Sequence, residues 1–211
     1  MAYFIVYWPQ DHVEKLKKAG DTGPIKVVFG SIHSRMPTIA SVKVGDVVFP
    51  VTLMKKKLNV MARLPVTHRE CAFDYCLREL GGDYGALLPE GIVVEHPGSF
   101  YWAWNCKSYN SPEELPAGVR LISLAEQGEK PHQAHQEPFN CCSQWAVWGE
   151  EGTFIEPRPL QDEVIPLLRF GYPKSKEKAL RLDKNGNILS MSLSATRRIA
   201  RESEKFFDGL F

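Results

Sequence analysis

The chain has 211 residues, of which 44% are hydrophobic and 24% charged, a composition typical of a globular domain and not of a disordered or fibrous protein. This length can bury a sizeable core, and no Pro-, Gly- or Ser-rich linker divides it, so we expect one domain over residues 1–211. The five cysteines are odd in number and irregularly spaced, which excludes a small disulfide scaffold and favours a reducing compartment.

The net charge of +1 hides an uneven distribution along the chain. Residues 1–69 hold 11 Lys+Arg and 4 Asp+Glu, residues 70–165 hold 5 and 16, and residues 166–211 hold 10 and 5. If the two basic ends come together in the fold, they form a surface that attracts a polyanion. The alternative is that the segments mix in space and the charges only keep the surface solvated.

The first residues do not resemble a targeting segment. The apolar run before Pro9 is too short for a secretory signal and lacks a cationic lead and a cleavage site, and no other stretch approaches a membrane span. We therefore expect a cytoplasmic protein without a membrane partner.

The first third of the chain predicts strands with one short helix. Residues 3–8 predict a buried strand that Pro9 ends, and residues 12–19 predict a helix with Asp11 and Glu14 as its capping pair. Residues 25–29 predict a second strand. Residues 47–54 and 58–66 predict a hairpin. The alternation of its second strand places Leu58, Val60, Ala62, Leu64 and Val66 on one face. Because proline has no N–H, Pro50 and Pro65 should lie at an edge, a bulge or a strand end.

The middle of the chain predicts one helix followed by strands. Thr67 and Glu70 form a candidate capping box for a helix that the Gly81-Gly82 pair ends. Strand-like runs follow, separated by Gly and Pro turns, at residues 92–95, 100–106, 119–125, 141–148 and 153–155.

The basic last third predicts a hairpin and a helix that pack on the same core. Asn185-Gly186 predicts a two-residue turn, which places Leu182 opposite Leu189. Residues 196–208 predict an amphipathic helix with Ile199, Phe206 and Phe207 facing inward. Together these patterns predict an α+β, β-rich fold with a few flanking short helices.

The opening order of elements resembles the PUA-like β-barrel superfamily. The matching segments cover about a third of the chain, within residues 1–70: the strand at 3–8, residues 33–36 (His-Ser-Arg-Met), residues 42–49 (Val-Lys-Val-Gly-Asp-Val-Val-Phe) and residues 62–66. The EVE, ASCH and YTH members of this family bind RNA or modified bases. The resemblance implies a partly closed barrel in which the Gly45-Asp46 turn leads into a strand that ends near the ligand pocket.

Aromatic side chains are the candidates for a ligand pocket. In the aromatic run 100–104, strand alternation places Trp102 and Trp104 on one face. The expected ligand-binding residues are Trp8, Arg35, Trp102, Trp104 and Trp145, and the tryptophan rings would stack on a modified or flipped base. The alternative is that these large aromatics simply fill the core.

Basic residues supply the expected contacts to a nucleic-acid backbone, and these are Lys55, Lys56, Lys57, Lys174, Lys176, Arg197, Arg198 and Arg201. The sequence therefore predicts a non-enzymatic domain that binds RNA or modified DNA and needs no cofactor. One alternative is a protein interaction module that uses the acidic middle segment.

The remaining candidate chemistry involves histidine and cysteine. His132, His135 and Cys141 are the candidate metal ligands, but their spacing does not match the usual zinc-binding pairs, so no metal is expected. A thiol of Cys141 or Cys142 beside one of these histidines would be an activated nucleophile, which leaves a thiol-dependent enzyme as a second alternative.

Overall fold

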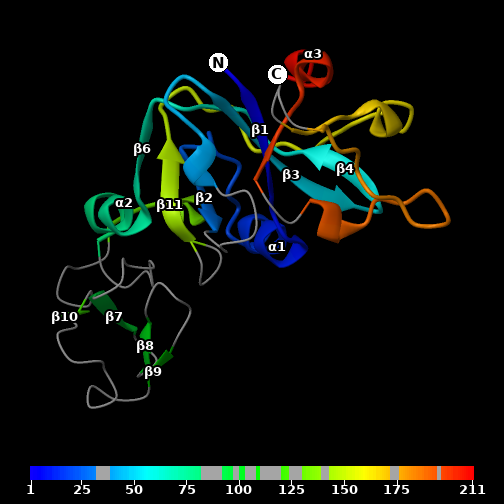
Figure 1. Ribbon diagram of the computed structural model, residues 1–211. Coiled ribbons are helices and arrows are strands. Elements are labelled where there is room, and N and C mark those ends of the chain that lie inside the picture. The colour runs from blue at the N-terminus through cyan, green and yellow to red at the C-terminus, as the bar shows by residue number, and fades with distance from the viewer. Residues whose placement is uncertain are drawn as a thin grey trace.

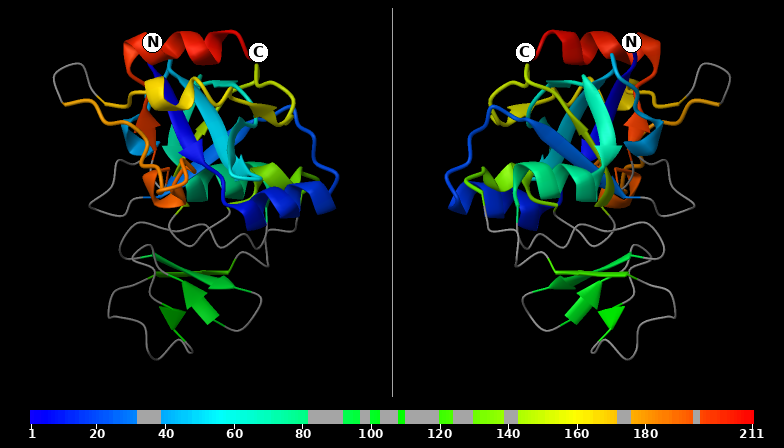
Figure 2. Two further views of the ribbon diagram at one scale, coloured as in Figure 1. Left: turned by 90° about the vertical axis from the view of Figure 1, so that its right-hand side faces the viewer. Right: turned by 90° about the vertical axis from the view of Figure 1, so that its left-hand side faces the viewer.

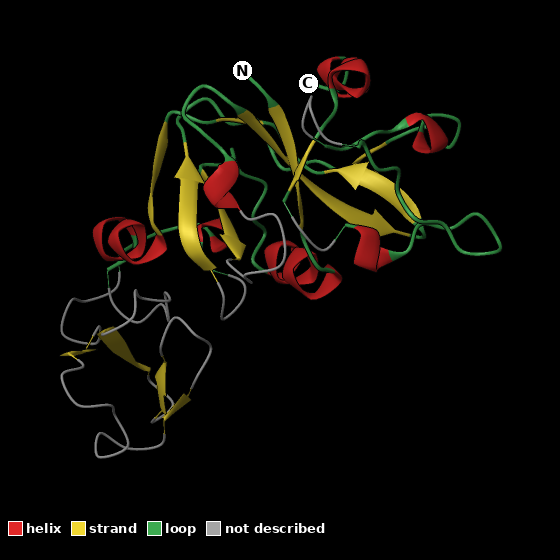
Figure 3. Ribbon diagram, in the orientation of Figure 1, coloured by secondary structure: helices red, strands yellow, loops and turns green. Residues whose placement is uncertain are grey.

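The computed structural model describes residues 1–31, 39–81, 92–96, 100–102, 108–109, 120–123, 130–138, 143–171, 176–193 and 196–211. Within these ranges the fold is α+β and strand-rich, as the sequence predicts (Figure 3). The α-helices are α1 (Gln10–Lys18), α2 (Ala72–Glu79) and α3 (Arg201–Asp208), and the 3-10 helices are η1 (Ile39–Ser41), η4 (Ala134–Gln136), η5 (Ile165–Leu167) and η6 (Ser190–Ser192). No helix in the described ranges is long and apolar enough to span a bilayer.

The main sheet has six strands in the order β12-β4-β3-β1-β13, with β5 paired to β3 beside β4 (Figure 1). Its strands are β1 (Tyr3–Tyr7), β3 (Val47–Met54), β4 (Lys57–Val60), β5 (Leu64–Pro65), β12 (Arg158–Pro159) and β13 (Arg197–Arg198). The β1–β3 pair is parallel, and the other pairs are antiparallel. Because β13 pairs with β1, the beginning and the end of the chain meet in one sheet.

Two smaller sheets complete the strand content. The second sheet has the order β2-β11-β6, formed by β2 (Val27–Ser31), β11 (Ser143–Trp148) and β6 (His68–Cys71). The third has the order β10-β7-β8-β9, formed by β7 (Ile92–His96), β8 (Phe100–Trp102), β9 (Ser108–Tyr109) and β10 (Arg120–Ser123). Figure 2 shows the third sheet set apart from the other two. Within the described residues, no strand pairing joins the three sheets into a closed barrel.

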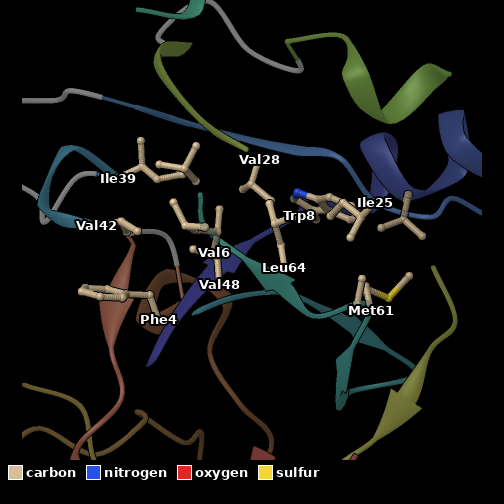
Figure 4. Close-up of a cluster of buried hydrophobic side chains, with 14 of the residues drawn as sticks. Phe4, Val6, Trp8, Ile25, Val28, Ile39, Val42, Val48, Met61 and Leu64 are labelled. Carbon is tan, nitrogen blue, oxygen red and sulfur yellow. The ribbon is translucent and has the colours of Figure 1, made fainter. Parts of the chain in front are cut away.

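Hydrophobic side chains cover both faces of the main sheet. On one face, Phe4, Val6 and Val48 pack with Val28 and Val147 of the second sheet (Figure 4). On the other face, a second cluster joins the sheet to the C-terminal segment, and its members include Ile5, Phe49, Val51, Leu168, Phe170 and Phe207. Strands β1 and β3 are therefore buried on both sides, which explains their nearly continuous apolar sequences.

The predicted hairpin at residues 47–66 is confirmed in its first half only. Met54 of β3 pairs with Lys57 of β4, so Lys55 and Lys56 form a two-residue turn. The second strand ends at Val60. Ala62 and Leu64, which alternation places on the same face as Val60, belong to the opposite cluster. The predicted alternation through Val66 is wrong because the chain crosses from one face of the sheet to the other after Val60.

Both predicted capping pairs are wrong. Helix α1 begins at Gln10 with Pro9 as its N-cap, so Asp11 lies inside the first turn. Residues 68–71 pair with β11 as strand β6, which keeps their backbone extended, and α2 starts only at Ala72. The Glu70 carboxylate therefore accepts hydrogen bonds from Arg78 and from the Trp148 indole instead of capping a helix.

The C-terminal hairpin turns over three residues and not two. Gly186 N–H donates to the Asp183 carbonyl, and Asp183 N–H donates to the Asn187 carbonyl. Leu182 is consequently opposite Ile188, and not Leu189 as the sequence predicted. The Asp183 carboxylate stabilises this turn by accepting hydrogen bonds from the backbone of Asn185 and Asn187. This is the three-residue loop in which glycine, here with φ of +80°, takes the left-handed position.

The predicted helix over residues 196–208 is shorter than expected. Arg197 and Arg198 form strand β13, and Ala200 is an extended N-cap before α3 begins at Arg201. Ile199 and Phe207 are buried as predicted. At residues 153–155, which the sequence assigned to a strand, the chain forms no strand.

Candidate nucleic-acid interface

Trp8 is a core residue and not a ligand-binding residue. Its side chain is 1% exposed and lies within the cluster between the main and second sheets (Figure 4). Its ring meets the His12 ring edge-on, with centroids 5.0 Å apart. The expectation that Trp8 lines an accessible pocket is therefore wrong, because the residue directly follows β1 and its side chain is packed inside the core.

Trp145 is the half-buried exception among the expected aromatic ligands. It lies on β11 and packs against the core cluster that contains Trp8. The guanidinium of the exposed Arg69 lies over its ring, 4.4 Å from the centroid. Trp102 contributes its backbone to β8, and its side chain is outside the description. Arg35 and Trp104 lie outside the described residues.

A second aromatic group, at Trp148, fastens α2 to the second sheet. The His68 ring stacks on the indole with centroids 3.8 Å apart and an interplanar angle of 7°. Glu70 accepts a hydrogen bond from the indole and two from Arg78, each 2.7 Å long. The Arg78 guanidinium also lies over the indole. Glu70, Arg78 and Trp148 are therefore hydrogen-bond and ring partners of one another, and they form a structural cluster.

Two turns that are far apart in the sequence enclose one surface pocket of about 250 Å³, which we call the hairpin pocket. The β3–β4 turn supplies its cationic rim through Lys56 and Lys57, and the 183–187 turn contributes Gly186. The lining residues are Lys56, Lys57, Leu58, Asp162, Ile165, Pro166, Leu182, Gly186 and Ile188. The floor is thus aliphatic, and not aromatic as the sequence led us to expect.

Positive charge predominates around the hairpin pocket. Lys55 and Lys56 are exposed on the β3–β4 turn, and Arg181 and Lys184 are exposed in the 181–187 segment. Lys57 forms an ion pair of 3.0 Å with Asp162 at the rim. Hydrogen bonds from Asn187 and Asn185, together with the charge of Lys56, hold the pKa of Asp183 below its ordinary value, which places Lys56 within electrostatic reach of the 183–187 turn.

The other predicted backbone contacts are distributed over a wider area. Arg197 is half-buried on β13, and burial, followed by the nearby charge of Arg181, lowers the pKa of its guanidinium. Burial and the negative charge of Asp208 raise the pKa of Glu204 on α3. The positive charges of Arg198 and Arg201 act to lower it, so these two residues lie near Glu204. Lys176 is exposed, and Lys174 lies outside the described residues. The structure therefore brings Lys56 and Lys57 together with the hairpin that carries Arg181 and Lys184. The charge of Arg181 itself acts on Arg197.

The candidate metal ligands have structural roles where they are described. The buried His135 ring accepts the Lys26 N–H at its Nε2 atom, at 3.0 Å, so its Nδ1 carries the proton and donates to Asp21 at 2.9 Å. Burial acts to raise the pKa of Asp21, but hydrogen bonds from His135 and Gly23 lower it below its ordinary value.

His132 contacts the Lys130 carbonyl and Glu137, and Cys141 and Cys142 lie outside the described residues. In the described ranges no three His, Cys, Asp or Glu side chains form a group that would hold a metal ion.

Sequence comparison adds no relative to this picture. No protein-family model matches the chain, and no curated protein matches it at a significant level.

Proposed function

We propose that this chain binds single-stranded nucleic acid, with the lysines of the β3–β4 turn and the cations of the 181–187 segment contacting the phosphates. The observation that carries the proposal is the meeting of these two basic segments, more than 120 residues apart in sequence, around one pocket. Phosphate contacts of this kind supply most of the sequence-independent affinity for nucleic acid.

The backbone of the β3–β4 turn supports this proposal. Lys55 and Lys56 have positive φ angles of 49° and 68°, which non-glycine residues rarely adopt. A two-residue turn of this type favours Asn-Gly, so two lysines here cost stability. Strained residues concentrate at functional sites, and the charge of the two lysines is a reason to retain them there.

The partly closed barrel of the PUA-like family belongs to the same proposal. Three features support it: the Gly45-Asp46 turn leads into β3, the Asp46 carboxylate accepts hydrogen bonds from the backbone of Ala2 and Lys43, and two sheets face each other across one core. We place the protein in the cytoplasm because its five irregularly spaced cysteines favour a reducing compartment. Recognition of a modified base, with Trp145 as an aromatic contact, remains part of this proposal.

The test compares two charge-matched double variants in binding a fluorescent single strand of about 12 nucleotides. Replacing Lys55 by Asn and Lys56 by Gly removes two charges while giving the turn its preferred residues. Replacing Lys17 and Lys18 by Gln removes the same charge from the exposed face of α1.

We expect the turn variant to bind roughly tenfold more weakly at about 0.1 M salt, because two phosphate contacts are lost. The α1 variant should bind like the unmodified chain. Equal affinities of the two variants would contradict the proposal, since total charge and not the turn would then decide binding.

A further inference from the structure

The hairpin pocket contains more than a phosphate-binding rim. Phosphate contacts need only exposed cations, yet this pocket has an aliphatic interior of Leu58, Ile165, Leu182 and Ile188. Leu58 is fully buried, whereas Leu182 keeps 41% of its surface exposed. A surface hollow that combines aliphatic side chains with a cationic rim suits a ligand that has a flat ring linked to an anionic part.

The volume of the pocket limits the size of that apolar part. Pockets for drug-sized ligands have volumes of roughly 300–1,000 Å³. A pocket of about 250 Å³ is below this range and suits a single ring system in preference to a complete dinucleotide. A nucleobase is such a ring system, and its phosphate would lie at the rim beside Lys56.

The rim also carries one acceptor among its cations. The Asp162 side chain is 66% exposed, and its Oδ2 atom accepts a hydrogen bond of 3.0 Å from Lys57. An ionised carboxylate has two oxygens and about four acceptor positions, so a single bond from Lys57 does not exhaust it. Aspartate and glutamate accept hydrogen bonds from the cytosine amino group, whereas uracil and thymine have a carbonyl oxygen at that position.

We propose that the hairpin pocket holds one unstacked nucleobase with an exocyclic amino group, such as cytosine, and that Asp162 accepts a hydrogen bond from that amino group. This inference rests on the proposed function, because the strand must first be held by its phosphates. The aliphatic floor covers the face of the base, and Asp162 distinguishes an amino group from a carbonyl oxygen.

The experiment measures the affinities of the full chain for two strands of about 12 nucleotides, oligodeoxycytidylate and oligodeoxyuridylate. Their backbones are identical, so phosphate contacts cancel in the ratio of affinities. We expect cytosine to bind about three- to tenfold more tightly, the effect of one hydrogen bond. In Asp162→Ala the affinity for the uridine strand should be retained or should rise, since a negative charge is lost. The cytidine strand loses its hydrogen bond, so the ratio of the two affinities should fall to about one.

Leu182 and Leu189 provide a matched pair that tests the floor. They are 41% and 42% exposed in the same hairpin, and Leu182 lines the pocket while Leu189 does not. Leu182→Ala should weaken the binding of both strands severalfold without changing the salt dependence, and Leu189→Ala should not. If the unmodified chain binds both strands equally, or if the two leucine variants behave alike, the pocket inference is overturned while the proposed function stands. If neither strand shows salt-dependent binding, the proposed function itself fails.

Discussion

His12 is the buried ionisable side chain with the clearest consequence at the residue scale. It lies on the inner face of α1, is 5% exposed and packs edge-on against Trp8. Burial, reinforced by the positive charge of Lys15, lowers the pKa of its imidazole to about 4. In the folded protein His12 is therefore neutral over a pH range in which an unfolded chain, with a histidine pKa near 6.5, binds a proton.

The stability of the fold should consequently depend on His12 below neutral pH. The contribution is fully present above pH 6.5 and is lost as the pH falls towards 4, because only the unfolded chain gains the proton in that interval. This shift corresponds to about 3 kcal/mol in the free energy of unfolding. Urea unfolding at several pH values should show a smaller loss in His12→Gln than in the unmodified chain. An identical pH dependence in the two proteins would show that His12 titrates normally.

Some residue roles are visible in the sequence and others are not. Val13 and Leu16 of α1 are buried, and their helical spacing is visible in the sequence because periodicity is a local property. The bond between Asp21 and His135 joins residues 114 positions apart, and no local pattern indicates it. His132 and His135 were metal candidates in the sequence because of their residue type. In the fold the buried His135 imidazole has Asp21 as its polar partner.

At the scale of elements, the β3–β4 turn offers a test that does not depend on any ligand. Replacing Lys55 by Asn and Lys56 by Gly relieves two left-handed lysines, so we expect the free energy of unfolding to rise by about 1 kcal/mol. The urea midpoint should increase while the slope of the transition stays constant. Unchanged or reduced stability would mean that the turn carries no backbone strain, and the functional argument from that strain would fall with it.

The two hairpins show what turn signals do and do not determine. The sequence located both turns, but it assigned the 183–187 turn a length one residue too short. The cause is the Asp183 side chain, whose hydrogen bonds to Asn185 and Asn187 stabilise a three-residue loop. A shift of one residue moves a whole side-chain set between faces, so Ile188 is buried while Leu189 is exposed. The hairpin pocket, which Ile188 lines, was not predictable from the sequence for this reason.

At the scale of the whole molecule, the two ends of the chain meet through the pairing of β1 with β13. Ile199 N–H donates to the Tyr3 carbonyl at 2.7 Å, and the Tyr3 hydroxyl donates to Asp208. Both termini lie at the same end of the molecule (Figures 1 and 2). The meeting of the ends does not itself form the candidate site, because the basic segments that line the pocket are the 55–57 turn and the 181–187 segment. The sequence identified these segments as basic, and only the fold shows that they are neighbours.

The dependence of affinity on salt tests the central claim most directly. Each phosphate contact to a single strand contributes about 0.7 to the negative slope of log affinity against log salt concentration. We predict a steep slope for the unmodified chain with a single strand of about 12 nucleotides, and a slope reduced by about 1.4 when Lys55 and Lys56 are replaced by Asn and Gly. A flat slope for the unmodified chain, or the same slope in both proteins, would contradict the account.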